Sequence, residues 1–321
     1  MRLPRLLSSA TAAVVLALSL SLPAPASADD AKTLRVGTIN LFGVASTFEQ
    51  AGHDKAGDIT FQIIPFTSGV VGLIAAINAG EIDVAEMGEV GPVVAQSADV
   101  EAQIIAATEP WRIGEALVVA GDSPIRTLED LKGKKISYSR ATNGQWVVNK
   151  ALQKAGLDIT DVESVFLPAG TNTLSVLEAG QIDVAVAIDA TLSAYEAQGA
   201  RRLVNAGDVD VDNALFFIAS NKAITEKKDA IGAFVNQLGK HLAWASENQE
   251  KHAGFVAELL GIEPEVTLSV ERNRPKKLQE IRPELIPSNQ AIADELFRQK
   301  VIEKEIRVDS SFNYEFNKYI P

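Results

Sequence analysis

The sequence contains no cysteine and only three histidines. Without cysteine the chain has no disulfide, no thiol nucleophile and no thiolate metal ligand. The histidines, His53, His241 and His252, show no metal-ligand spacing, and we expect His241 and His252 on the surface of helices. Motifs for phosphate loops, dinucleotide loops and serine hydrolases are also missing. These absences predict that the chain is not an enzyme and carries neither a cofactor nor a metal.

A surplus of basic residues is missing as well. The 42 acidic residues outnumber the 30 lysines and arginines, which gives a net charge of −12. Nucleic acid and anionic membrane surfaces attract basic proteins, so we predict that neither is a partner.

The sequence also has no apolar run long enough to span a membrane, which takes about 20 residues. The longest candidate, residues 12–22, follows Arg2 and Arg5 and is followed by the small residues that end at Ala28. This pattern is typical of a secretory signal peptide. We predict that residues 1–28 are removed after Ala28 and that the mature protein is periplasmic.

Strand-like apolar runs alternate with helical stretches in the first two thirds of the chain, which predicts parallel α/β layers. After residue 220 helices dominate. The expected strands are 33–40, 59–66, 103–108, 134–139, 162–168 and 183–188, and the expected helices are 44–52, 69–80, 91–98, 144–156, 173–180, 192–199, 229–248, 252–261 and 288–302.

One helix-to-strand corner occurs twice, 100 residues apart. "NAGEIDVAEMGEV" (78–90) is matched by "EAGQIDVAVAIDA" (178–190), with Glu89 answered by Asp189 at the end of the strand. Coincidence between generic βα units is the alternative. We interpret the repeat as two lobes built on one βαβ plan, joined by two crossover strands at 115–124 and 215–220. The predicted division is a signal peptide at 1–28, a first lobe at 29–112 and 220–321, and a second lobe at 113–219.

Small polar loops precede one helix in each lobe. In the first, Ser68 is a possible N-cap and the N–H groups of Gly69 and Val70 open the helix; in the second, Thr142 or Asn143 is the cap and Gly144 permits close approach. The start of a helix attracts anions. Two such loops in matching places predict an anion site between the lobes, although capping without a ligand is the alternative for each.

Four further residues are candidate ligand contacts. Arg140 could pair with an oxyanion or remain solvated, and Trp111 could form a wall of the site or pack in the hinge. Glu89 and Asp189 could accept hydrogen bonds from a ligand amine or cap the helices that follow them.

With these residues in hand, the chain resembles the periplasmic substrate-binding proteins of ABC importers, in the aliphatic sulfonate, taurine and nitrate group. The likeness runs from about residue 33 to 320 and rests on "NAGEIDVAEMGEVGPVVAQSA", "GEALVVAGDSPIRTLEDLKGKKIS" and "AGQIDVAVAIDATLSAYEAQG" in order. The resemblance implies an α/β, type II periplasmic-binding fold whose two lobes close over a ligand. By position it implies ligand contacts from Asn40, Leu41, Ser68, Gly69, Val70, Glu89, Thr142, Asn143, Gly144, Gln145 and Asp189.

The chain departs from the group's pattern at two of these places. Ile188, Asp189, Ala190 and Thr191 stand where the group often has W-D-P-Y, and Gln145-Trp146 stand where a small polar residue and His-Tyr are common. The missing aromatics are expected to enlarge that wall of the site.

The sequence therefore predicts a monomeric, exported solute-binding protein for a small organic anion, a sulfonate or taurine first, that delivers it to an ABC permease in the inner membrane. A receptor for a neutral or amine-bearing heterocycle, such as a pyrimidine vitamin precursor, is the alternative within the same fold. An enzyme on this scaffold is the alternative from another class.

Overall fold

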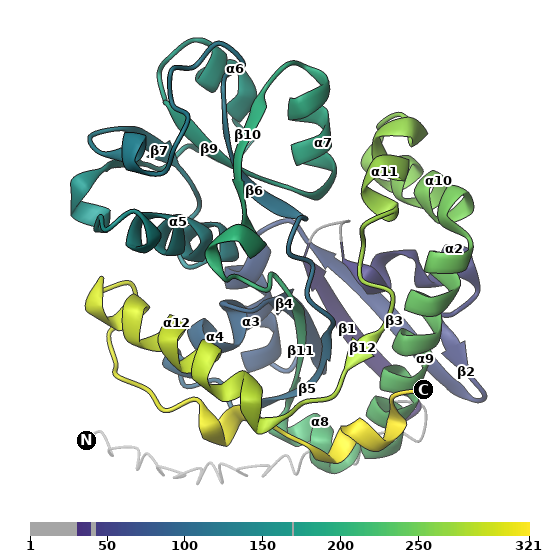
Figure 1. The fold of residues 1–321 in the computed structure, drawn as a ribbon. Helices are drawn as coiled ribbons and strands as arrows, with labels where there is room; N and C mark the ends of the chain where they lie inside the picture. Colours follow the sequence, from purple (N-terminus) through teal and green to yellow (C-terminus); the bar gives the residue numbers. More distant parts are fainter. Residues whose placement is uncertain (1–30, 40–42, 169) are drawn as a thin grey trace, which may run out of the picture.

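The computed structural model describes residues 31–39, 43–168 and 170–321 of the chain. The predicted signal peptide, Asn40 and Leu41 therefore lie outside the described residues. Within them the chain forms two α/β units, each a sheet with the helices that cover it. We call the unit around the seven-stranded sheet the first or larger layer, and the unit around the five-stranded sheet the second or smaller layer. Figure 1 shows the smaller sheet above the larger one, with the C-terminal helices reaching from the larger sheet towards the smaller.

The larger sheet has the strand order β12-β5-β11-β4-β1-β3-β2. β1 pairs in parallel with β3 and β4, whereas β11 runs antiparallel between β4 and β5. Its strands are β1 (Thr33–Ile39), β2 (Lys55–Ala56), β3 (Ile59–Phe66), β4 (Val84–Gly88), β5 (Ala102–Thr108), β11 (Leu215–Ser220) and β12 (Leu278–Gln279).

The smaller sheet repeats the central part of this order as β10-β6-β9-β7-β8. β7 pairs in parallel with β8 and β9, and β6 runs antiparallel between β9 and β10. Its strands are β6 (Glu115–Val119), β7 (Lys135–Ser137), β8 (Glu163–Val165), β9 (Val184–Ile188) and β10 (Arg201–Asn205).

Both faces of each sheet are covered by helices. The described helices of at least six residues are α3 (Gly69–Asn78), α4 (Gly91–Ser97), α5 (Asn143–Lys154), α6 (Thr173–Glu178), α7 (Asp189–Ala197), α8 (Asn221–Glu226), α9 (Lys228–Glu247), α10 (Gln249–Leu260), α11 (Pro264–Glu271) and α12 (Ile286–Arg298). Shorter helical segments are η1 (Val44–Thr47), α2 (Phe48–Ala51), η2 (Glu129–Leu131), η3 (Ile159–Asp161), η4 (Ala206–Val209), η5 (Pro283–Leu285), η6 (Asp309–Ser311) and η7 (Glu315–Tyr319).

Residues 116–119 of β6, which follow Glu115, form a continuous apolar run. Ala116 and Val118 belong to the apolar cluster on the side of α6 and α7, whereas Leu117 and Val119 belong to the cluster that includes α5. Successive side chains of a strand point to opposite faces, so a strand covered on both faces is apolar at every position.

The repeated corner is a structural repeat. Gly80 and Gly180 end their helical segments in the left-handed region, with φ of 71° and 67°, where glycine has no steric cost. The aspartate of each copy then accepts an N–H from the start of the neighbouring strand: Asp83 from Arg35 at 2.9 Å and Asp183 from Lys135 at 2.8 Å. The register of β1 with β4 recurs 100 residues later in β7 with β9. The two layers therefore share the same pairing of these strands and the same aspartate contact.

The two aspartates differ in what else they bind, which gives a stability prediction. Asp83 is buried and also accepts the Arg35 guanidinium at 2.7 Å and the buried Lys227 ammonium at 3.0 Å. Asp83→Asn is expected to lower the free energy of unfolding by about 2 kcal/mol, because hydrogen bonds to charged groups are the strong ones. Asp183→Asn, the matched control, is expected to cost about 0.5 kcal/mol. Urea unfolding of both variants measures the difference, and equal losses would contradict it.

The chain crosses between the layers twice, in segments that lie side by side. Residues 109–114 lead from β5 to β6, and residues 206–214 lead from β10 back to β11. The N–H of Trp111 donates to the Asp212 carbonyl at 2.9 Å, and the N–H of Gly207 donates to the Arg112 carbonyl at 2.8 Å. The stretches 115–124 and 215–220 were predicted as the crossover strands; in the structure 115–119 is β6 inside the smaller sheet and 215–220 is β11 inside the larger sheet.

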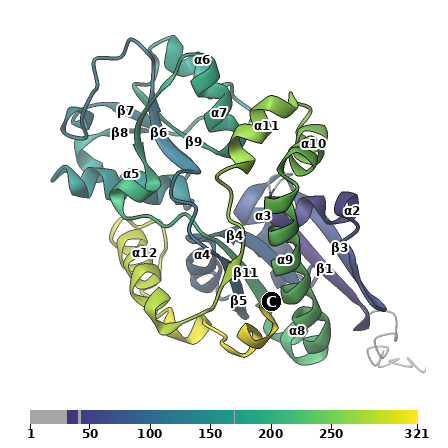
Figure 2. The ribbon, with the colours of Figure 1, turned by 45° about the vertical axis from the view of Figure 1, so that its right-hand side comes forward.

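The C-terminal helices touch the smaller layer on two sides. α11 lies beside α7, and α12 lies beside α5, in both views of the ribbon (Figure 1, Figure 2). Ser269 donates to Ser193 at 3.0 Å on the α7 side, and Gln145 donates to Gln299 at 2.8 Å on the α5 side. The space between the layers is thus bounded by the crossings and flanked by these contacts.

Candidate functional site

A cavity of about 510 Å³ lies between the two layers. This volume is within the range of small-molecule sites. Residues from both sheets and from both crossings line it, and most of the lining residues are apolar or glycine. The lining residues are Ile39, Gly43, Gly69, Val70, Glu86, Gly88, Gly91, Trp111, Glu115, Ser137, Tyr138, Ser139, Thr142, Asn143, Gly144, Leu167, Pro168, Gly170, Thr171, Thr173, Val186, Ile188, Asp189, Asn213 and Leu215.

Two helix starts, those of α3 and α5, face this cavity. Their N-cap residues, Ser68 and Thr142, make no side-chain cap hydrogen bond. At the start of α6, whose Thr173 also lines the cavity, and at the start of α8, Asn172 and Ser220 do act as caps, each accepting a backbone N–H at 3.1 Å. The first N–H groups of a helix have no acceptor within the helix. The two starts at the cavity therefore keep N–H groups that a ligand could use.

Asn143, at the start of α5, also joins the two layers. Its Oδ1 accepts the N–H of Val90 at 3.1 Å, and its Nδ2 donates to the Asn213 side chain at 3.1 Å. A β-carbon on Gly88 would lie 2.5 Å from the Asn143 oxygen, so glycine at 88 allows this close approach. The helix start is thereby fixed against the end of β4.

Three buried glutamates surround the cavity. Burial raises the pKa of Glu86 to about 7, although the N–H groups of Val44 and Ala45 donate to its carboxyl and act to lower the pKa. Burial raises the pKa of Glu89 to about 8, although its carboxyl accepts the N–H of Asn213 at 3.0 Å.

The third glutamate, Glu115, opens β6 and lines the cavity. Burial raises its pKa to about 8, and the charge of Glu89 adds to the rise. Its Oε2 is buried and has no hydrogen-bond partner among the described residues. A buried polar atom without a partner is costly in a native protein and is often found at functional sites.

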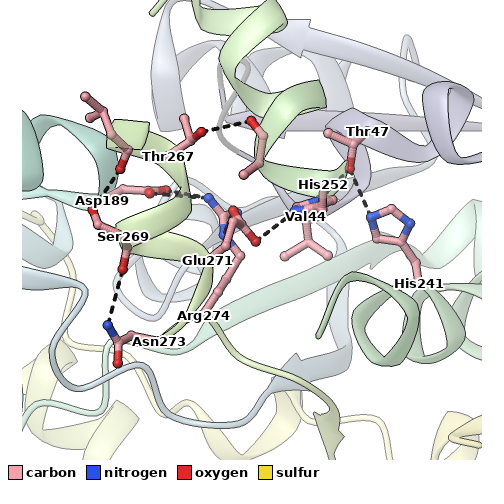
Figure 3. A network of polar contacts seen from close by, with 12 residues as sticks. Val44, Thr47, Asp189, His241, His252, Thr267, Ser269, Glu271, Asn273 and Arg274 are labelled. Atoms are coloured by element: carbon pink, nitrogen blue, oxygen red, sulfur yellow. Dashed lines mark hydrogen bonds and ion pairs between the residues drawn. The ribbon is translucent and has the colours of Figure 1, made fainter. Parts of the chain in front are cut away.

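An ion pair across the layers lies beside the cavity, and its carboxylate partner, Asp189, is one of the lining residues (Figure 3). The Asp189 carboxylate, at the start of α7, receives the Arg274 guanidinium at 3.0 Å, and that guanidinium lies over the Trp111 ring at 5.4 Å. Asp189 has a φ of 55°, a strained conformation for a residue with a side chain. Its N–H donates to the Gly114 carbonyl at 2.8 Å, so backbone and side chain both hold it in place.

The polar contacts continue from this ion pair into the first layer (Figure 3). Arg274 also pairs with Glu271 at 2.8 Å, which binds His252 at 2.7 Å. Thr47 lies between His252 and His241, with its Oγ1 2.9 Å and 3.0 Å from their Nε2 atoms. Both histidines are buried, which corrects the expectation that they lie on the surface; they hold α9 and α10 to η1.

Seven of the thirteen predicted site residues line the cavity. They are Gly69, Val70, Trp111, Thr142, Asn143, Gly144 and Asp189. Asn40 and Leu41 lie outside the described residues. The other four, Ser68, Glu89, Arg140 and Gln145, are not among the lining residues. Their contact with a ligand, like that of the seven, stays a prediction.

The side chains of Glu89, Arg140 and Gln145 make other contacts. The Glu89 carboxyl accepts the N–H of Asn213 in the second crossing, and the Arg140 guanidinium lies 5.7 Å from the centre of the Phe166 ring. Gln145 accepts the Ala141 N–H at 2.8 Å. The N-cap positions of α4 and α7 are Val90 and Ile188, so neither Glu89 nor Asp189 occupies a capping position.

Sequence reasoning missed Glu86, Glu115 and Arg274. The first two had a usable signal, because each is the single charged residue of an otherwise apolar strand that is buried on both faces. Charged residues are rarely buried without a specific role. Arg274 had no such signal, since nothing in its own segment points to Asp189.

Among residues 31–39, 43–168 and 170–321, no helix has the length and hydropathy to cross a membrane. The same residues contain no group of three or more histidine, aspartate or glutamate side chains arranged to hold a metal ion.

Comparison with known proteins gave matches over most of the chain. The family model described as NMT1/THI5 like matches residues 55–252. A protein of Escherichia coli K12 named for binding aliphatic sulfonates is 25% identical over 239 residues, 74% of each chain. The solved alkanesulfonate-binding protein SsuA of Xanthomonas axonopodis, bound to MOPS, superposes with a TM-score of 0.79 at 24% identity, covering 88% of this chain and 98% of that one.

The same fold also occurs in an enzyme. The solved desulfurization enzyme DSZB superposes with a TM-score of 0.65 at 16% identity, covering 89% of this chain and 98% of that one. The solved structures thus show the periplasmic-binding-protein fold for this chain.

Proposed function

The chain belongs to the NMT1/THI5-like family, and we propose that it is an exported solute-binding protein that captures a small organic sulfonate between its two layers and delivers it to an ABC permease. The observation that carries the proposal is the cavity of about 510 Å³, into which two helix starts point without side-chain caps. The names of the E. coli relative and of the Xanthomonas SsuA structure support the ligand class.

The proposed role of the helix starts follows from their electrostatics. A sulfonate carries three acceptor oxygens and one negative charge, and the N–H groups at Gly69, Val70 and the first turn of α5 supply donors from both layers. Hydrogen bonds to charged groups contribute about 1.5–3 kcal/mol each, and micromolar binding needs about 8 kcal/mol in all. A few such donors therefore suffice without a lysine or arginine in the lining.

The acidic lining is compatible with this role near neutral pH. Burial raises the pKa of Glu86 to about 7 and of Glu115 to about 8, so Glu115 is mostly neutral in the empty protein at pH 7. Asp189 is balanced by Arg274 at 3.0 Å. The lining thus carries less negative charge than its three carboxyls suggest.

We propose that the two lobes that close over the ligand are the units built around the two sheets. Because β11 lies in the larger sheet, the second lobe would end before Leu215 rather than at residue 219. The contacts of Arg274 with Asp189 and of Gln299 with Gln145 join the lobes outside the crossings, and ligand-driven closure would act on these contacts. The proposed export rests on the leader sequence 1–28. We propose that the protein is a monomer and that its partners are the small ligand and the permease.

Calorimetric titration with propane-1-sulfonate, butane-1-sulfonate, taurine, sulfate and nitrate tests the ligand class. We expect micromolar binding of at least one organic sulfonate, and binding of none would refute this class. Gly144→Ala is expected to weaken it about tenfold, because the added β-carbon would lie 2.9 Å from Val186 and displace the start of α5. Gly254→Ala, which meets no atom within 4 Å, is the control and should bind as the parent does.

A receptor for an amine-bearing heterocycle is the second candidate, and the presence of Glu86, Glu115 and Trp111 in the lining of one cavity favours it. Such a ligand would bind without a sulfonate group, so titration with aminopyrimidines separates the two candidates. We propose that the chain is not an enzyme, since it has no cysteine and its histidines are engaged in the first layer. Turnover of any bound compound, detected by mass spectrometry, would contradict this.

A further inference from the structure

The contacts that join the two layers outside the crossings differ on the two sides of the molecule. On the right of Figure 1, the segment after α11 meets the start of α7 through Arg274 and Asp189, which pair at 3.0 Å with both side chains buried. On the left, α12 meets the second layer through Arg298 and Asp158, which pair at 2.8 Å with side chains 49% and 40% exposed. We call these the α7–α11 contact and the α5–α12 contact.

The α7–α11 contact is continuous with the first crossing. Trp111 of that crossing, Ala190 of α7 and Val270 of α11 belong to one apolar cluster. The N–H of Asp189 donates to the carbonyl of Gly114, at the end of the same crossing, at 2.8 Å. Because lobes rotate about the segments that connect them, a contact this close to a crossing lies near the axis and is displaced little.

The segment that carries Arg274 is held firmly to the first layer. Glu271 pairs with Arg274 at 2.8 Å and with His252 at 2.7 Å, and the Thr47 hydroxyl of η1 lies 2.9 Å from His252 (Figure 3). Arg274 therefore moves with the first layer, whereas Asp189 belongs to α7 of the second. Their ion pair joins the two layers directly.

Breaking the α7–α11 contact would cost much more than breaking the α5–α12 contact. Separation at α7 and α11 would take a buried ion pair apart and expose the apolar cluster to water. A ligand of micromolar affinity would lose a large share of its binding free energy to that cost. The α5–α12 contact consists of an exposed ion pair and of neutral amide bonds from Gln299 to Gln145 and Asn149, at 2.8 Å and 2.9 Å, which water can replace at a small cost.

We infer that the α7–α11 contact is a non-covalent pivot, a third connection between the layers that stays intact while the lobes close, and that the lobes slide at the α5–α12 contact. This inference rests on the proposed function, because it concerns closure over a ligand. Closure is then asymmetric: the edge of the cavity at Asp189 stays fixed, and the edge at the start of α5 moves.

Pulsed EPR distance measurements test this asymmetry. The chain contains no cysteine, so spin labels attach only at introduced ones. Ala197→Cys with Glu265→Cys spans the pivot, and the matched pair, Gln153→Cys with Asp294→Cys, spans the α5–α12 contact; these sites are all exposed. On addition of butane-1-sulfonate or taurine, the second distance should change at least about three times as much as the first, because displacement grows with distance from the axis. A ratio near one, or a larger change across the pivot, overturns the inference.

A disulfide that locks the pivot gives a second test. The Oγ atoms of Ser193 on α7 and Ser269 on α11 are 3.0 Å apart, so Ser193→Cys with Ser269→Cys places two thiols within reach of each other. If the pivot stays intact during closure, the oxidised double variant should bind the same sulfonate within about twofold of its reduced form. A loss of about tenfold or more on oxidation, reversed by reduction, would show that the contact has to open.

The inference and the proposed function fail separately. If neither butane-1-sulfonate nor taurine binds the parent protein, the sulfonate proposal loses these ligands, and the spin labels still test the pivot in the empty protein. There the distance across the pivot should have a narrower distribution than the distance across the α5–α12 contact, because the weaker contact opens more often. Equal widths would overturn the pivot whatever the ligand is.

Discussion

Replacing Arg274 with methionine is expected to lower the free energy of unfolding by about 3–5 kcal/mol, the usual cost of removing one partner of a buried ion pair. Arg274 is 7% exposed and pairs with Asp189 at 3.0 Å and with Glu271 at 2.8 Å. Methionine keeps most of the packing over the Trp111 ring but leaves two carboxylates in the interior without this cation. Urea unfolding at pH 7 measures the loss.

Two further variants show whether the loss comes from the ion pair. Arg272→Met, two residues earlier and exposed, is the control and should change the stability by less than about 0.5 kcal/mol. Asp189→Asn combined with Arg274→Met should be more stable than the sum of the single losses, because residues in direct contact are coupled. Additive losses would show that the contact between α7 and the segment after α11 carries no interaction energy.

Raising the pH from 6.5 to 8.5 in the absence of ligand is expected to destabilise the protein by about 4 kcal/mol, about 2 kcal/mol from each of Glu89 and Glu115. Burial raises both pKa values to about 8, whereas an unfolded glutamate has lost its proton long before pH 6.5. The folded state thus binds more protons in this window, so stability falls as the pH rises through the folded pKa and levels off above it.

The window is chosen so that other groups do not mask the effect. Burial lowers the pKa of His241, so the folded state is destabilised only below about pH 6.5, where the unfolded histidine binds a proton that the folded one does not. Above this pH the contribution of His241 to stability is nearly constant. Glu86, with a pKa raised to about 7, adds a smaller loss of the same sign.

Glu89→Gln provides the matched test of this pH dependence. The amide can still accept the Asn213 N–H but does not ionise, so the variant should lose about half of the parent's decline between pH 6.5 and 8.5. Glu81→Gln, an exposed site at the corner before β4, should retain the full decline. A parent protein whose stability is flat or rises across this window would contradict the assigned burial of these carboxyls.

Much of the fold was predictable because its signals are local. The strands 59–66 and 215–220 were predicted with the observed bounds, since each is written as a nearly continuous apolar run. The 100-residue repeat was visible because a left-handed glycine and an aspartate that binds the neighbouring strand are both needed at each corner. β10 was not predicted, because "RRLVN" has two arginines and no alternation that separates it from a loop.

The site was only partly predictable. The helix starts at Gly69 and Gly144 were found from loop chemistry, and both line the cavity. The repeated acids Glu89 and Asp189 are equivalent in sequence but differ in their contacts. In the structure Glu89 turns to the second crossing, whereas Asp189 lines the cavity and binds Arg274.

The sequence by itself determined the succession of strands and helices, the duplicated corner and the two helix starts, because each depends on residues within one or two turns of chain. The tertiary structure alone decided that Arg274 meets Asp189, 85 residues away, and that Oε2 of Glu115 is buried without a hydrogen-bond partner among the described residues. Such pairings depend on how the C-terminal helices pack against the second layer. The packing is set by many weak apolar contacts at once, and no short stretch of sequence records their sum.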